Sequence, residues 1–152
     1  MTFLYLDPSA WVKRYYHERG SECVQRLFSG EHARVCSVLG LVEVVATLAR
    51  KCRAAEITRE DFEAKTAEIE RDWQRFVQIE LTLSGLDQAK DAAARLALRG
   101  ADAVHFAALR SVAQRLSNSG HQVLLVASDR ELKRAAEASG FHVIDPETDP
   151  AA

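Results

Sequence analysis

The chain has 152 residues, of which 47% are hydrophobic and 28% charged, with 3 prolines and 7 glycines. This balance excludes a disordered or fibrous protein, and the length fits one domain. The net charge of -2 arises from 22 acidic and 20 basic side chains. It excludes a histone-like polycation, so any polyanion would have to bind at a local patch.

The composition also indicates where the protein works. No apolar run approaches the roughly 20 residues of a membrane span, and the N-terminal segment lacks the pattern of a signal peptide. The three cysteines, Cys23, Cys36 and Cys52, form no CxxC pair and lie within apolar patterns, which is typical of reduced core thiols. We therefore expect a cytoplasmic protein without membrane contact.

Short apolar segments alternate with helical patterns along the whole chain. In the first part we expect a strand over 3–6, a helix from Pro8 to about Tyr16, a strand over 34–37, a helix over 38–52 and an exposed, charged helix from Thr58 to about Arg75. In the second part we expect an edge strand over 76–81, a helix from Ser84 to Gly100, a helix from Asp102, a buried strand over 123–127, a helix over 128–138 and a strand over 141–144.

This alternation predicts the fold class. Parallel strands need crossover helices and bury both of their faces, so the pattern indicates an α/β protein, a three-layer α/β/α sandwich with a mainly parallel sheet. We expect a single domain over 1–146 and a frayed tail over 147–152. In such folds ligands bind beyond the carboxyl ends of the strands, where the strand order switches.

Two acidic residues directly follow predicted strands. Asp7 follows the first strand, and Asp129 follows the strand over 123–127. Each also has a local explanation, because Asp7 can cap the helix that starts at Pro8, and Ser128 can cap the next helix in a capping box with Glu131. Neither residue alone distinguishes a site from a helix cap.

Two further acids lie on apolar helices. Glu43 is the only ionisable group between Ser37 and Ala49, and a buried carboxylate must take a proton, pair with a cation or bind a metal. The alternative is an ion pair with Arg50 on the same helix face. Asp102 begins another apolar helix, and His105, one turn along, could hydrogen-bond to it as an accessory residue.

The four acids become informative if the topology brings them to one edge of the sheet. Carboxylate oxygens suit Mg²⁺ or Mn²⁺, and such a site would support phosphodiester hydrolysis. Ser9, two residues after Asp7, could cap the helix or hold a metal-bound water. The sequence has no Cys/His set for zinc, no Walker A loop and no GxGxxG motif.

In this order and spacing, the segments at 4–10, 41–44, 101–105 and 127–130 resemble the four acidic motifs of PIN-domain ribonucleases. The chain is most similar to the VapC-type toxins of bacterial toxin–antitoxin modules. The resemblance implies a Mg²⁺- or Mn²⁺-dependent endoribonuclease, a homodimer, and a cognate antitoxin protein that occupies the active groove. By position, it implies an acidic catalytic and metal site of Asp7, Glu43, Asp102 and Asp129, with Ser9 as an accessory contact.

The resemblance leaves several points open. Some members carry a further acid two residues after the third motif's carboxylate, where this chain has Val104, so the site could hold one metal or two. An idle PIN-like module that acts through protein contacts is the alternative function. The helix that carries Glu43 and the stretch 58–73 are the expected interaction surfaces.

Cations near the acids could bind the RNA substrate. We single out Lys13, Arg14, Arg50 and Arg130, although a solvated helix face explains such residues equally well. Trp11 and Tyr15 could stack on bases, but aromatic residues four positions apart on a helix belong more often to the core.

Overall fold

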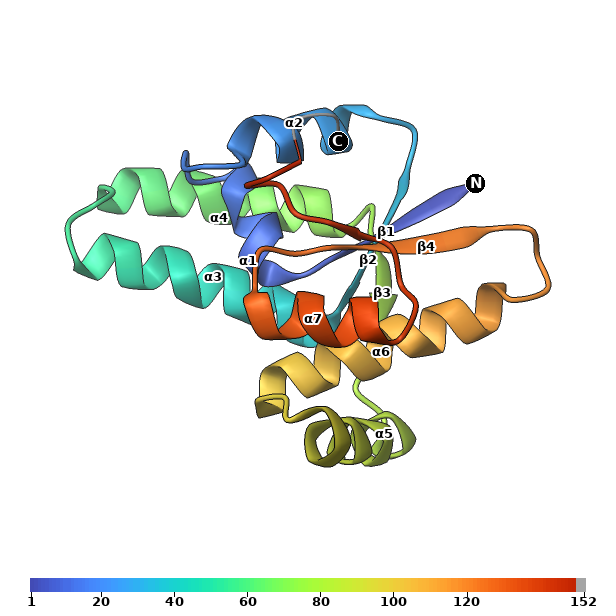
Figure 1. The fold of residues 1–152 in the computed structure, drawn as a ribbon. Helices are drawn as coiled ribbons and strands as arrows, with labels where there is room; N and C mark the ends of the chain where they lie inside the picture. The colour runs from blue at the N-terminus through green and yellow to red at the C-terminus, as the bar shows by residue number, and fades with distance from the viewer. Residues whose placement is uncertain (150–152) are drawn as a thin grey trace.

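A five-stranded parallel sheet runs through the computed structural model, which describes residues 1–149 (Figure 1). Its spatial order is β3-β2-β1-β4-β5, and every neighbouring pair is parallel. The strands are β1 (Thr2–Leu6), β2 (Ala33–Ser37), β3 (Val77–Ile79), β4 (Gln122–Val126) and β5 (Val143–Ile144). The predicted parallel sheet is confirmed, with the segment near 76–81 supplying the edge strand.

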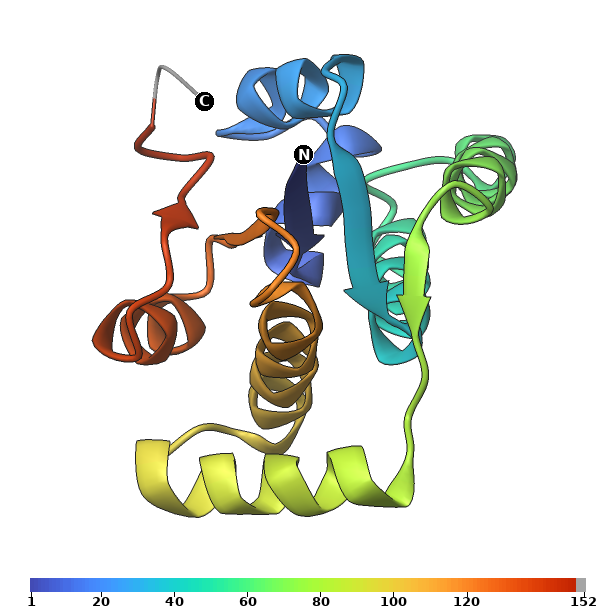
Figure 2. The same cartoon turned by 90° about the vertical axis from the view of Figure 1, so that its right-hand side faces the viewer.

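Helices cover both faces of this sheet, which confirms the three-layer α/β/α class. On one side lie α1 (Pro8–Trp11), the 3-10 turn η1 (Val12–Arg14), α2 (Ser21–Ser29), α3 (Val38–Arg53) and α4 (Arg59–Trp73). On the other lie α5 (Leu83–Leu96), α6 (Gly100–Leu116) and α7 (Arg130–Ala138). Helix α5 packs on α6 and lies farther from the strands (Figure 2).

The alternating side chains of β1 separate the two cores. Tyr5 is fully buried against the layer of α5, α6 and α7, whereas Leu4 and Leu6 are buried against the layer of α1 to α4. Successive strand residues point to opposite faces, so a central strand with helices on both sides must be apolar throughout. Trp11 and Tyr15 belong to the second core, which confirms the core interpretation of these aromatic residues.

Several element boundaries differ from the prediction. Helix α1 ends at Trp11 and continues only as a 3-10 turn to Arg14, short of Tyr16. Helix α2 was not predicted, because it starts after Gly20 in the left-handed conformation (φ 92°) with no side-chain cap. A Cβ at Gly20 would lie 2.9 Å from the Pro146 carbonyl carbon, so this turn needs glycine for both conformation and space.

The break between α5 and α6 also falls earlier than predicted. Helix α5 has Thr82 as its N-cap and ends at Leu96, where Ala97 adopts a left-handed conformation (φ 54°). Helix α6 then begins at Gly100 and not at Asp102. Alanine rarely adopts a positive φ, so no local signal marked this break. At Thr58, by contrast, the predicted capping box with Asp61 is present.

The segment beyond Pro146 is tied to the body of the protein. Lys13 Nζ donates to Glu147 Oε1 at 2.9 Å, and Arg19 Nε donates to the Glu147 carbonyl at 3.1 Å. Of the tail predicted over 147–152, residues 150–152 lie outside the described part of the chain. Within residues 1–149, no helix is both long and apolar enough to cross a membrane. The thiols of Cys23 and Cys36 are free and buried.

The strand order creates a switch point beside β1. From β1 the chain moves outward through β2 to β3, and it later returns to the other side of β1 as β4. In Figure 1, β1 and β4 run leftward, and α6 and α7 begin on that side. The carboxyl ends of β1 and β4 therefore meet where a fold of this kind binds ligands.

Candidate active site

Asp7 lies at the carboxyl end of β1 and is 3% exposed. It is the N-cap of α1, and its side chain accepts a hydrogen bond from the Ser9 backbone nitrogen at 3.0 Å. Burial raises the pKa of the Asp7 carboxyl above its ordinary value; His105 and the bonds from Ser9 oppose this rise, and Glu43 adds to it. Capping therefore explains the position of Asp7 but not its burial among ionisable groups.

Ser9 connects the ends of β1 and β4. Its hydroxyl donates to Asp7 Oδ2 and accepts hydrogen bonds from the backbone nitrogens of Ser128 at 3.0 Å and Asp129 at 3.1 Å. This single hydroxyl fixes the start of α1 against the loop that leads into α7.

Asp129 is the N-cap of α7, because its Oδ1 accepts from the Leu132 backbone nitrogen at 2.8 Å. The interpretation of Ser128 as the cap was wrong by one residue. The Ser128 hydroxyl instead donates to Asp145 Oδ1 at 3.4 Å. Asp129 thus combines a capping role with a place at the switch point.

Asp102 occupies the first turn of α6 and is half-buried. Burial raises its pKa to about 6, and the carboxylates of Asp129, Asp7 and Glu43 add to the rise while His105 opposes it. Charges shift a pKa strongly only over short distances, so this set of contributors indicates that all four predicted acids face one region. Ser9 joins the ends of β1 and β4, so Asp7 and Asp129 lie at the same edge of the sheet.

Glu43 projects from α3 toward α6 and forms a hydrogen bond with His105, with Oε1 and Nε2 2.6 Å apart. The two contacts considered in the sequence analysis, Glu43 with Arg50 and His105 with Asp102, are both wrong. The partner of Glu43 is not Arg50, which donates to Thr47 Oγ1, and the partner of His105 is not Asp102. The second ring nitrogen of His105 is engaged by the Tyr5 hydroxyl at 2.9 Å, so both nitrogens have partners other than Asp102.

Comparisons with known proteins identify the family. No model of a known protein family matches the chain. Ribonuclease VapC45 of Mycobacterium tuberculosis (strain CDC 1551 / Oshkosh) is 37% identical over 155 residues, covering 99% of this chain and 100% of that protein. The chain belongs to the VapC ribonuclease family.

Solved VapC structures share the fold. Mycobacterium tuberculosis VapC20, described as a Sarcin-Ricin loop cleaving toxin, matches with a TM-score of 0.68 at 21% identity, over 97% of this chain and 99% of that one. A chain of the DNA-bound VapBC of Salmonella typhimurium matches with a TM-score of 0.58 at 15% identity, over 96% and 99%. At these identities the likeness concerns the fold alone.

The four acids of this VapC chain offer oxygen donors for a metal ion. Among residues 1–149, no group of three or more Asp, Glu, His or Cys side chains lies close enough to hold an ion as placed. Neighbouring carboxylates nevertheless add to the raised pKa values of Asp7 and Asp102, after burial as the first cause. Hard oxygen donors with mutual repulsion fit a divalent cation.

Two cations predicted to bind substrate are instead held in ion pairs. Lys13 is 4% exposed and its Nζ lies 3.1 Å from Glu18 Oε1 and 2.9 Å from Glu147 Oε1. Arg14 Nε donates to Asp72 Oδ2 at 2.7 Å. We assign both residues a structural role in this VapC fold.

The sequence did not indicate a role for three residues that lie around His105. They are Tyr5, Cys36 and Gly40. Tyr5 resembled an ordinary strand residue, although a tyrosine buried inside a central strand must find a partner for its hydroxyl, and that requirement was a usable signal. Cys36 and Gly40 gave no signal, because their place beside His105 depends on how β2, α3 and α6 pack together.

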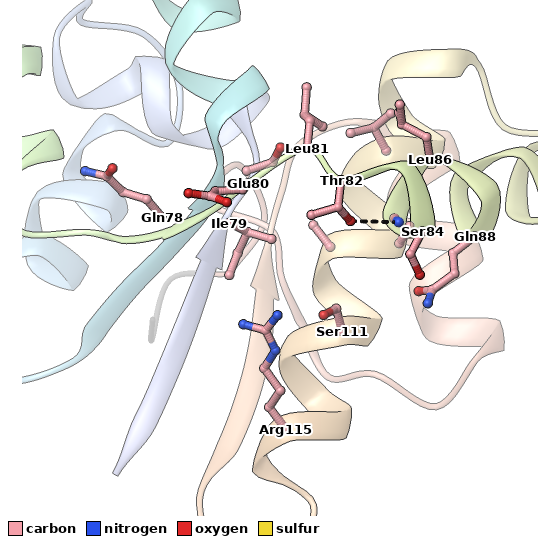
Figure 3. Close-up of a pocket in the computed structure, with 15 residues that line it drawn as sticks. Gln78, Ile79, Glu80, Leu81, Thr82, Ser84, Leu86, Gln88, Ser111 and Arg115 are labelled. Atoms are coloured by element: carbon pink, nitrogen blue, oxygen red, sulfur yellow. Dashed lines mark hydrogen bonds between the residues drawn. The ribbon is translucent and has the colours of Figure 1, made fainter.

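A pocket of about 340 Å³ lies beside this site and includes none of the four acids. It is bounded by β3, the start of α5 and one side of α6 (Figure 3). Figure 3 shows Arg115 reaching from α6 toward Ile79, with Leu81 and Leu86 on the opposite side. Val104, next to Ala103 on α6, also lines this pocket.

Proposed function

We propose that this chain is a Mg²⁺- or Mn²⁺-dependent endoribonuclease that hydrolyses RNA phosphodiester bonds, and that it is the toxin of a toxin–antitoxin pair. The single observation that carries the proposal is the crowding of acids at the switch point, where Ser9 joins Asp7 to the Asp129 segment and where burial and three carboxylates from other segments raise the pKa of Asp102 to about 6. Such crowding of acids weakens a fold unless a cation relieves it, and it is typical of functional sites. Membership of the VapC ribonuclease family indicates the class of reaction, which is RNA cleavage.

Asp7, Glu43, Asp102 and Asp129 would hold the metal. When bound, Mg²⁺ or Mn²⁺ would neutralise charge on the scissile phosphate and lower the pKa of an attacking water. The chain's own residues position the carboxylates. Ser9 fixes Asp7 relative to Asp129, and His105 holds one oxygen of Glu43.

The exposed residues Arg50 and Arg130 would bind RNA phosphates beside the acids. Single-stranded or looped RNA is the expected substrate, because its bases are splayed and its phosphates accessible. We place this activity in the cytoplasm, where such RNA is found.

RNA cleavage with and without metal tests the proposal. The purified chain should cut single-stranded RNA with Mg²⁺ or Mn²⁺ and stop cutting in EDTA. Asp7→Asn and Asp102→Asn should each lower the rate at least ~100-fold, the scale for removing one preorganised electrostatic group. Asp87→Asn is the matched control, since Asp87 lies on α5 in an exposed ion pair with Lys90.

Each other outcome has a clear meaning. Cleavage at wild-type rates by both site variants would contradict the assignment and indicate a contaminating nuclease. A pure protein that binds neither Mg²⁺ nor Mn²⁺ and cuts no RNA would support the idle interaction module instead.

We also propose an antitoxin partner, supported by the likeness to VapBC structures such as that of Salmonella typhimurium. Co-expression with the product of the adjacent upstream reading frame should yield a stable complex that has lost RNA cleavage. A complex that cleaves RNA at the rate of the free chain would contradict inhibition at the active groove.

The sequence indicated two surfaces for the proposed homodimer, the helix that carries Glu43 (α3) and the stretch 58–73, and on α3 the side chain of Val42 is 64% exposed. On α4 the largest apolar residues, Ile69 and Trp73, are buried within the protomer. Exposed apolar side chains gather on β3, α5 and the loop between them: Val77, Leu81, Leu83 and Leu86. An edge strand beside exposed leucines is a surface that proteins rarely leave uncovered, and we propose a second copy as its partner.

A further inference from the structure

A continuous buried hydrogen-bond chain runs behind Glu43. Glu43 Oε1 lies 2.6 Å from His105 Nε2, and His105 Nδ1 lies 2.9 Å from the Tyr5 hydroxyl. The backbone nitrogen of Ser37 donates to the same hydroxyl at 3.3 Å. Because Ser37 is the N-cap of α3, the chain begins and ends on the helix that carries Glu43.

The direction of the bond to Glu43 does not depend on the charge of His105. An ionised carboxylate can only accept hydrogen bonds, so Nε2 must donate whether the ring is neutral or charged. The exposed fractions of the side chains fall along the chain, from 33% at Glu43 to 1% at His105 and 0% at Tyr5. One side of the carboxylate is thus anchored in the protein, and the other side remains accessible at the edge of the sheet.

The backbone of α3 is shaped to allow this contact. A Cβ at Gly40 would lie 2.3 Å from Cys36 Sγ and 3.4 Å from His105 Cε1. A side chain at Gly40 would collide with Cys36 Sγ, whereas its contact with His105 Cε1 would be an ordinary one, so glycine lets α3 lie against both residues. This close approach is a second observation, independent of the hydrogen bonds, that the imidazole is built into its place.

We propose that Tyr5 and His105 are positioning residues that hold the Glu43 carboxylate in the orientation needed to bind the metal. The inference rests on the proposed function, in which Glu43 is a metal ligand. A side chain that fixes a metal ligand from behind typically changes metal affinity 10- to 100-fold when its hydrogen bond is lost. Tyr5 acts at one remove, because it orients the imidazole and the imidazole orients the carboxylate.

Calorimetric titration with Mn²⁺ tests this role without any RNA. Tyr5→Phe removes one hydroxyl and keeps the buried ring, and it should weaken Mn²⁺ binding about 10-fold. Tyr15→Phe is the matched control. Tyr15 is also buried, and its hydroxyl bonds to Asp72 at 2.7 Å and to Trp11 at 2.9 Å, so its loss should lower the melting temperature and leave Mn²⁺ affinity unchanged.

Two further variants separate positioning from general stability. His105→Gln keeps an N–H that can reach Glu43 and should retain more Mn²⁺ affinity than His105→Leu, which keeps none. In a Glu43→Gln background, Tyr5→Phe should cause no further loss of affinity, because the ligand on which it acts is already impaired.

The outcomes distinguish this inference from the proposed function. Normal Mn²⁺ binding by wild type and by Tyr5→Phe would overturn the positioning role and leave the metal site intact. An equal loss in the Tyr5→Phe variant with and without Glu43→Gln would also overturn it, because the effect would not pass through Glu43. No Mn²⁺ binding by the folded wild-type chain would overturn the metal site itself and this role with it.

Discussion

Ser9 Oγ lies 3.1 Å from the backbone nitrogen of Asp129, although 120 residues separate the two in the chain. The same hydroxyl donates to Asp7, so one small side chain ties together the segments after β1 and β4, each of which carries a carboxylate. This contact crosses the switch point between β1 and β4. It makes the active-site geometry depend on a residue that carries no charge.

Ser9→Ala should therefore weaken Mn²⁺ binding about 10-fold and lower the melting temperature. The substitution leaves the N–H groups of Ser128 and Asp129 without their acceptor, and it releases one contact on Asp7. Ser9→Thr keeps the hydroxyl and should retain most of the affinity. The control is Ser29→Ala, because the Ser29 hydroxyl donates only within α2, to the Gln25 carbonyl. Equal Mn²⁺ affinity in wild type and Ser9→Ala would contradict the bridging role.

The strands and the placement of Asp7 and Asp129 at the switch point could be predicted because both follow from short-range patterns. An apolar run followed by Asp7 places a carboxylate at a strand end, and parallel topology brings such ends to one edge. The partners of buried polar groups could not be predicted in the same way. His105 has Asp102 one turn away, yet it bonds to Glu43, 62 positions distant, and Lys13 bonds to Glu147, 134 positions distant.

Asp7→Asn should raise the melting temperature of the metal-free protein. The substitution removes a buried charge whose pKa is raised by burial and by Glu43, and asparagine can still cap α1. Mn²⁺ at 100 times its dissociation constant should stabilise wild type by about 2.7 kcal/mol and the variant by much less. Thermal melts in EDTA and in excess Mn²⁺ measure both effects. If Asp7 serves only as a cap, the variant will be neutral or less stable, and Mn²⁺ will shift neither protein.

The metal-free protein should become more stable as the pH falls from about 7 to 5. The pKa of Asp102 in the folded state is about 6, above its ordinary value of 3.8, so the folded state takes up this proton before the unfolded state does. His105 acts in the same direction: burial opposes its charge, but its hydrogen bonds to Cys36 and Glu43 raise its pKa well above 6.5. Asp145, whose pKa is lowered, acts in the opposite direction only at more acidic pH.

Melts in EDTA between pH 5 and pH 7.5 check this dependence, and Asp102→Asn should flatten it. Mn²⁺ competes with the Asp102 proton, so Mn²⁺ affinity should decrease below about pH 6 in wild type. A metal-free protein that loses stability steadily over this range would contradict the raised pKa of Asp102.

Leu83→Asp should convert the proposed dimer to a monomer. Leu83 is 85% exposed at the start of α5, and a charge on each copy would be buried against apolar surface and against its counterpart. Light scattering after size-exclusion chromatography gives the mass directly. Ala64→Asp, on the exposed side of α4, is the control for one of the surfaces that the sequence indicated. Dissociation by Ala64→Asp with an intact Leu83→Asp dimer would assign the interface to α4 instead.

Arg50→Ala and Arg130→Ala should weaken RNA binding, whereas Lys13→Met should lower stability. Both arginines are exposed, so each could release one counterion from single-stranded RNA, and its loss should reduce the slope of log affinity against log salt by about 0.7. Lys13 is enclosed by Glu18 and Glu147, and its removal leaves two carboxylates facing each other without a cation. RNA binding by metal-free protein at several salt concentrations, compared with melting temperatures, separates the two classes. An unchanged salt slope in both arginine variants, with a reduced slope in Lys13→Met, would restore Lys13 to the RNA-binding surface and remove the arginines from it.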